Sequence, residues 1–131
     1  MLLNDRLKTI EVKDRYFTKD AELFNFMGYK FEGCKFNGFK MSSCCFNLCT
    51  FNNCIFENCT FLNHRIQDSV FDGTKFMNCS FMNLVIYNCF GDTIVENCKI
   101  QKLNIMANSI RVFNFIGCKI SGIEIVFTIV N

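Results

Sequence analysis

A large apolar residue recurs at every fifth position along most of this 131-residue chain. Thirteen consecutive positions at this spacing carry one: Phe26, Phe31, Phe36, Met41, Phe46, Phe51, Phe56, Phe61, Ile66, Phe71, Phe76, Phe81 and Ile86. One residue is then missing near Tyr87–Phe90, and nine further repeats follow: Phe90, Val95, Ile100, Ile105, Ile110, Phe115, Ile120, Ile125 and Val130. This repeat constrains the fold more than any other feature of the sequence.

A spacing of five fits neither a helix nor an ordinary strand. On an α-helix, five residues turn the chain by about 500°, so successive apolar residues would point about 140° apart. In a plain strand, side chains alternate between two faces, so a step of five reverses the face each time. A short extended piece followed by a bend in every repeat satisfies the spacing, and a chain that coils in this way is a β-solenoid. The sequence therefore predicts an all-β fold.

A second inward position precedes each large apolar residue by two. Eight of the ten cysteines fall there, whereas Cys45 and Cys89 lie outside this register and are the thiols expected to react with a probe. Each pentad thus reads small, polar, large, polar, polar, with its two inward residues on one side of a short strand. Asn88 and Asn108 also fall at inward positions, where we expect them to hydrogen-bond each other or the backbone. Polar turn formers mark the corners, as in Asn37-Gly38, Asn52-Asn53 and Asp72-Gly73.

The pattern Cys-x-Phe occurs at Cys34-Lys35-Phe36, Cys44-Cys45-Phe46, Cys49-Thr50-Phe51, Cys54-Ile55-Phe56, Cys59-Thr60-Phe61 and Cys79-Ser80-Phe81. With these repeats, residues 24–130 resemble the pentapeptide-repeat family, whose pattern is written A(D/N)LXX with Leu or Phe at its centre. The resemblance implies a right-handed quadrilateral parallel β-helix with four pentads in each coil. A coil then holds twenty residues, and residues 24–131 form about five coils.

Stacked side chains can be predicted by adding twenty, or nineteen across the missing residue. One core ladder joins Cys59, Cys79, Cys98 and Cys118. A second joins Phe31, Phe51, Phe71 and Phe90. Like residues then lie over like residues, which favours close interior packing.

The two ends of the chain carry different expectations. Residues 1–23 do not repeat and are predicted to form an N-terminal cap, as a short helix across residues 4–15 with Leu7 and Ile10 inward or as an irregular segment. The last coil is apolar and leaves an open edge, which invites pairing with a second copy. The expected dimer edge is Ile123, Ile125, Phe127 and Ile129. The alternative is that the chain is a fragment of a longer protein.

Composition limits the partners and the location. Fourteen basic and twelve acidic residues give a net charge of +2, which is too small to indicate a nucleic-acid or membrane partner. Asp5, Arg6 and Lys8 interrupt the apolar start before a secretory signal can form, and no apolar run is long enough to span a membrane. We therefore expect a cytoplasmic protein with reduced thiols, although export without a signal stays open.

No catalytic, metal or cofactor site is predicted. Cys44, Cys49, Cys54 and Cys59 would point inward from the four sides of one coil, but their spacing lacks the short C-x2-C pair of zinc sites and Phe rings fill the interior. His64 is the only histidine, so no histidine pair exists, and a hydrogen-bonded structural role or a local distortion is expected for it. The chain is therefore interpreted as a non-enzymatic protein.

The sequence favours a binding or scaffold module that presents rigid flat faces to a protein partner, whose identity the sequence does not give. Two alternatives follow from the resemblance. Some pentapeptide-repeat proteins of the quinolone-resistance group bind DNA gyrase by imitating DNA, although mimicry needs an acidic surface and residues 24–131 carry nine basic and seven acidic residues. The chain could instead be one repeat module of a bacterial effector.

Overall fold

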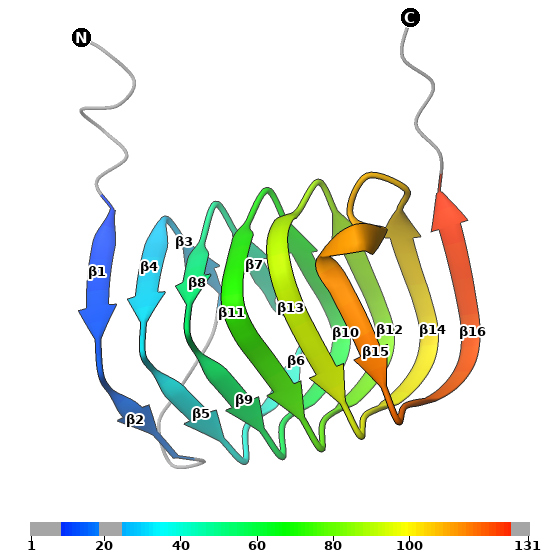
Figure 1. Cartoon of the computed structure of the whole chain (residues 1–131), viewed down its shortest axis with the longest axis horizontal. Coiled ribbons are helices and arrows are strands. Elements are labelled where there is room, and N and C mark those ends of the chain that lie inside the picture. Colours follow the sequence, from blue (N-terminus) through cyan, green and yellow to red (C-terminus); the bar gives the residue numbers. More distant parts are fainter. Residues whose placement is uncertain (1–8, 19–24, 127–131) are drawn as a thin grey trace, which may run out of the picture.

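The computed structural model describes residues 9–18 and 25–126, which coil into an all-β solenoid of about six turns (Figure 1). One sheet contains β1 (Ile10–Lys13), β2 (Tyr16–Phe17), β4 (Tyr29–Glu32), β5 (Lys35–Asn37), β8 (Thr50–Asn52), β9 (Ile55–Glu57), β11 (Val70–Met77), β13 (Phe90–Glu96) and β15 (Phe113–Ile116). The other contains β3 (Phe26–Met27), β6 (Lys40–Ser42), β7 (Cys45–Asn47), β10 (Thr60–Gln67), β12 (Ser80–Tyr87), β14 (Lys99–Met106) and β16 (Lys119–Val126). A 3-10 turn, η2 (Ile110–Val112), interrupts one coil.

Each sheet covers two of the four sides of the solenoid. The first half of β10 pairs with β6 and its second half pairs with β7, so β10 itself bends around a corner. β11 pairs with β8 and β9 in the same way. All strand pairs among the described residues are parallel, and the pairing of Phe31 with Phe51 sets a coil of twenty residues. The predicted parallel solenoid is confirmed.

The five-residue period arises from one left-handed residue at each corner. The second residue after the large apolar one has a positive φ in most pentads, and at seven of these corners it is an asparagine: Asn53, Asn58, Asn63, Asn78, Asn83, Asn88 and Asn97. Asparagine tolerates this conformation better than most residues do. The corner backbone is also paired between coils: the amide of Asn53 donates to the carbonyl of Asp72 at 2.7 Å. Corners and strands therefore share one continuous ladder.

Phenylalanine rings form the core as stacks along the axis. The ring centroids of Phe31 and Phe51 are 5.2 Å apart, and those of Phe51 and Phe71 are 5.1 Å apart, with the planes nearly parallel. Phe36, Phe56 and Phe76 make a second stack, with spacings of 4.5 and 4.7 Å. Rings on neighbouring sides meet edge to face, so the interior of these coils is filled with aromatic side chains.

The described part of the N-terminal segment continues the solenoid. β1 pairs with β4 and β2 pairs with β5, which places Val12 beside Phe31 and Phe17 beside Phe36. The rings of Phe17 and Phe36 stack at 5.0 Å. The alternative of a helix across residues 4–15 with Ile10 inward is wrong for its described part, because residues 10–13 form a strand and Ile10 is 47% exposed. These strands raise the coil count above the expected five, while a capping role for residues 1–23 stays a prediction.

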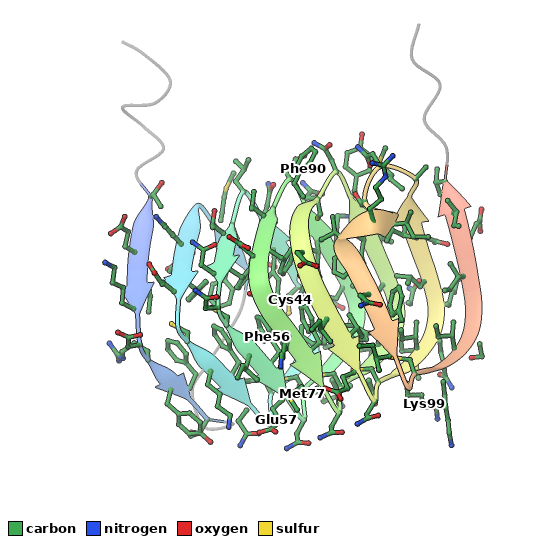
Figure 2. The ribbon with its side chains drawn as sticks, viewed as in Figure 1. Cys44, Phe56, Glu57, Met77, Phe90 and Lys99 are labelled. Atoms are coloured by element: carbon green, nitrogen blue, oxygen red, sulfur yellow. The ribbon has the colours of Figure 1, made fainter. Side chains whose placement is uncertain are left out.

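The missing residue lies later than the sequence indicated. The pairing of β11 with β13 skips Gly73, between the pairs Asp72–Asp92 and Thr74–Thr93. Gly91 therefore lies opposite Phe71, and Phe90 is turned outward and 52% exposed (Figure 2). The assignment of Phe90 to the inner ladder was wrong, because a glycine occupies the inward position and has no apolar side chain to reveal the register. A Cβ on Gly91 would overlap the carbonyl oxygen of Phe71, so only glycine fits there.

Candidate functional site

The ladder of cysteines lies inside the solenoid as predicted. Cys59, Cys79 and Cys98 are buried and Cys118, in the last coil, is half-buried. Each thiol contacts backbone carbonyls; the Cys79 sulfur lies 3.4 Å from Phe56 O of the preceding coil and 3.3 Å from Met77 O, and the two oxygens share its single S–H proton. Thr74 occupies the equivalent place on another side, and its hydroxyl donates to Phe51 O at 2.8 Å. The small inward position thus suits a side chain that can donate a hydrogen bond, which its size alone did not indicate.

The buried thiols of Cys54 and Cys89 are poor nucleophiles. All ten cysteines are free thiols. Burial raises the pKa of Cys54 to about 12 and that of Cys89 to about 11, so neither is a thiolate near neutral pH. The prediction that Cys89 is an accessible thiol was wrong: it is fully buried at the inward position, because the register slips after it. Cys45 is half-buried on the outer surface.

His64 is enclosed in the aromatic core. It is 1% exposed, and its ring centroid lies 4.5 Å from that of Phe46 and 5.1 Å from that of Phe61. The expected hydrogen bond is not found, because neither ring nitrogen has a partner among the described residues. Burial lowers the pKa of His64 to about 4, so the imidazole is neutral at pH 7.

Asn88 and Asn108 are bonded to each other but do not point inward. The amide of Asn108 donates to Asn88 Oδ1 at 3.2 Å, and that of Asn88 donates to Asp68 Oδ1 at 2.8 Å. Asn88 has the positive φ of a corner residue and is half-buried, whereas Asn108 is exposed. The hydrogen bond between the two asparagines was predicted correctly. Their predicted inward position was wrong, because the register slips only after Asp92.

The outer surface is where the four sides differ, and one of them carries only positive charge. Its outward residues form two columns along the axis, Lys40–Thr60–Ser80–Lys99–Lys119 and Ser42–Leu62–Met82–Gln101–Ser121. We call these ten residues the lysine side. Lys102 lies at its corner, and residues 39–43, 59–63, 79–83, 98–102 and 118–122 include no acidic residue. Figure 2 shows Lys99 projecting from the outside of the solenoid.

The lysine side is hollowed between two of its lysines. A hollow of about 330 Å³ is lined by Lys40, Thr60, Leu62, Ser80, Phe81, Met82, Lys99 and Gln101. Met82 on this side is 48% exposed. Over residues 9–18 and 25–126, the one ion pair joins Lys35 to Glu57 at 3.2 Å, so the lysines around the hollow have no carboxylate partner there. Lysines at both ends of an apolar hollow can bind a ligand that has an acidic group on each side of an apolar group.

The opposite side has a different charge pattern. The outward residues Lys13, Glu32, Asn52, Asp72 and Asp92 follow one another from coil to coil. Asp72 and Asp92 are direct neighbours, and their like charges repel. The net charge of +2 therefore conceals a polarised molecule. Sequence reasoning missed both columns, although the twenty-residue coil with its nineteen-residue step was sufficient to align Lys40, Lys99 and Lys119.

The last described strand leaves apolar residues exposed. Within β16, Ile120, Ile123, Ile125 and Val126 are each 40–43% exposed. Of the predicted dimer edge, Ile123 and Ile125 lie in this strand, whereas Phe127 and Ile129 lie outside the described residues.

The described residues hold no cluster of three or more His, Cys, Asp or Glu side chains arranged to bind a metal ion. No helix among them has the length and apolar character to cross a membrane.

Comparison with known proteins points to the fold. No family model matches the chain, and no curated protein does. Among solved structures, a trypsin-treated form of QnrB1, a plasmid-mediated fluoroquinolone resistance protein, is 12% identical with a TM-score of 0.50, and the match covers 88% of this chain and 67% of that one. A pentapeptide repeat protein, Rfr23 from the cyanobacterium Cyanothece 51142, is 11% identical with a TM-score of 0.28, over 92% of this chain and 83% of that one. At this identity the likeness to QnrB1 shows a shared β-solenoid fold.

Proposed function

We propose that the chain is a non-enzymatic binding module of the pentapeptide-repeat kind, which presents a flat side of its solenoid to a partner protein. The observation that carries this proposal is the lysine side, where lysines without a carboxylate partner among the described residues flank an apolar hollow. Supporting it, the inward residues are committed to packing: the Phe stacks fill the interior, and the inward thiols bond backbone carbonyls. Free thiols also suit a reducing compartment, so we propose a cytoplasmic location.

The proposal is tested by capturing partners from the native host with the purified protein and with variants altered on one side at a time. Lys40→Glu with Lys99→Glu changes the lysine side, and Lys30→Glu with Lys75→Glu makes an equal change on two other sides. A binding module should retain a reproducible partner that one of these pairs abolishes. Loss of every captured protein from both pairs alike, or capture of none by the unaltered chain, would contradict the proposal.

Gyrase binding of the quinolone-resistance type is the second candidate. The observation in its favour is the acidic column through Glu32, Asp72 and Asp92, which lies on the side opposite the lysines. A DNA mimic needs negative charge over a large surface, and the lysine side works against it. A gyrase supercoiling assay with micromolar protein decides this candidate, because an inactive protein at that concentration ends it.

A further inference from the structure

The lysine side combines two kinds of contact in a fixed order along the axis. Lys40 lies at one end of the hollow and Lys99 at the other, three coils away. Leu62 and Met82 lie beside the centre of this interval, on the two coils between. Lys119 lies one coil beyond Lys99. The order along the axis is therefore positive, apolar, positive, positive.

The dimensions of this order match an extended peptide. Neighbouring coils are about 4.8 Å apart, so Lys40 and Lys99 are about 14 Å apart and Lys40 and Lys119 are about 19 Å apart. In an extended chain, residues i, i+2, i+4 and i+6 point to the same face, and residue i+4 lies about 13 Å and residue i+6 about 20 Å from residue i. A peptide laid along the axis can thus meet all four features with one face.

We propose that the lysine side binds an extended acidic segment of a partner protein with the pattern acidic-x-apolar-x-acidic-x-acidic. The three acidic residues pair with Lys40, Lys99 and Lys119, and the apolar residue enters the hollow over Leu62 and Met82. Charge complementarity orients the bound peptide along the axis. The lysines are available for this, because no carboxylate within the described residues pairs with them. This inference rests on the proposed function and names the class of partner.

The chemistry of the hollow favours a protein over other polyanions. A nucleic acid is held mainly by contacts to its phosphates, which a continuous row of basic residues serves best. Here two hydroxyl residues, Thr60 and Ser80, separate Lys40 from Lys99, and the neighbouring positions are the apolar Leu62 and Met82. An exposed apolar centre with charges at its rim is the usual arrangement of a protein-binding surface. Anionic membranes are bound by clusters of about four to eight basic residues, and the lysine side itself has only three lysines, Lys40, Lys99 and Lys119.

The test measures fluorescence anisotropy of a labelled peptide, Asp-Ser-Phe-Ser-Glu-Ser-Glu, with the full chain. We expect saturable binding with a dissociation constant below about 1 mM, weakened by added salt. The Lys40→Glu, Lys99→Glu variant should bind about tenfold more weakly, whereas Lys30→Glu, Lys75→Glu should change the affinity less than about twofold. The control peptide Asp-Phe-Ser-Glu-Ser-Ser-Glu has the same composition but places Phe and one Glu on the other face, and should bind more weakly. Thermal unfolding of both variants checks that they remain folded.

Several outcomes would overturn the inference. The inference fails if the labelled peptide shows no saturable binding, if both variants lose the same affinity for it, or if the two peptides bind equally. It also fails if a 20-base-pair DNA or phosphatidylserine vesicles bind more tightly than the peptide. A faster-sedimenting species that Lys40→Glu with Lys99→Glu abolishes would instead assign the lysine side to a second copy of the chain. If the host capture experiment still finds a partner that depends on another side, the proposed function stands and only the lysine-side inference fails.

Discussion

At the scale of single residues, His64 occupies a place that a leucine fills one coil later. Its ladder neighbour Leu84 is 3% exposed, and the chain continues that ladder with Leu103. The imidazole makes edge contacts with Phe46 and Phe61 but leaves both ring nitrogens without partners among the described residues. A buried polar atom without a hydrogen bond lowers stability, by roughly 1–3 kcal/mol.

The buried imidazole makes stability depend on pH. The pKa of His64 is about 4 in the folded chain and about 6.5 when unfolded, so the unfolded state binds more protons between these values. Stability is complete above about pH 6.5 and is lost as the pH falls towards 4, by about 3 kcal/mol in all. Urea unfolding at pH 7, 5.5 and 4 measures this loss.

His64→Leu is the control, because it removes this titration and leaves the carboxylates unchanged. The variant should be more stable than the natural chain at pH 7, and its advantage should grow as the pH falls. An advantage that stays constant from pH 7 to pH 4 would show that His64 does not resist protonation.

Leu48 is a corner residue whose backbone conformation is unfavourable for leucine. Its φ is 54°, in the region that costs most L-residues about 1 kcal/mol, and its side chain is 45% exposed, so it gains little from burial. Leu48→Asn should therefore raise the free energy of unfolding by about 1 kcal/mol, and the reverse change Asn53→Leu should lower it by a similar amount. Chemical denaturation measures both, and a destabilised Leu48→Asn would show that the leucine side chain makes a contact worth more than the backbone strain.

At the scale of strands, the register of β13 decides which of two adjacent residues is structural. Gly91 lies against the backbone of Phe71, while Phe90 points outward. The ring of Phe113, farther along the axis, packs over the place that the glycine leaves without a side chain. Its centroid lies 5.8 Å from that of Phe71. The coil between them contributes no ring at that place.

This register makes opposite predictions for two alanine substitutions. Gly91→Ala should destabilise the fold by more than about 2 kcal/mol, because the new methyl group meets a backbone carbonyl and the φ of +113° is unfavourable for alanine. Phe90→Ala should cost less than about 1 kcal/mol. Thermal unfolding of the two variants measures the difference. A cost of 3–5 kcal/mol for Phe90→Ala, typical of a buried ring, would restore the register that the sequence suggested.

At the scale of the whole molecule, the solenoid is uniform inside and polarised outside. The lysine side and the acidic column through Asp72 and Asp92 lie on opposite sides. At its C-terminal end, β16 exposes Ile120, Ile123 and Ile125. We propose that a second copy covers this end, because an apolar edge that has no strand partner among the described residues favours association.

Self-association is expected to depend on protein concentration. Sedimentation velocity from about 1 to 200 µM should show a shift from monomer to dimer, given the weak affinity of a small interface. Ile123→Lys with Ile125→Lys should hold the chain monomeric, whereas Val70→Lys, at an exposed apolar residue on another side, should leave dimerisation unchanged. A monomer at every concentration would contradict the dimer.

The sequence by itself determined the repeat, the inward residues of most pentads and the corners, because each recurs with the five-residue period. It also supplied the alignment of the cysteine ladder from Cys59 to Cys118, which the strand pairing reproduces. It misplaced Phe90 and Cys89, because a glycine at an inward position looks like a break in the repeat.

Only the tertiary structure decided part of the surface. A step of nineteen from Asp72 leads to Gly91, but β13 places Asp92 beside Asp72, because the residue is lost after this pair. The loss of one residue in β13 shortens one coil, and an error in its place changes which side chains turn inward on that strand. A five-residue period can therefore specify which residues of a solenoid point inward. The charge on each side depends on the register between strands of different coils.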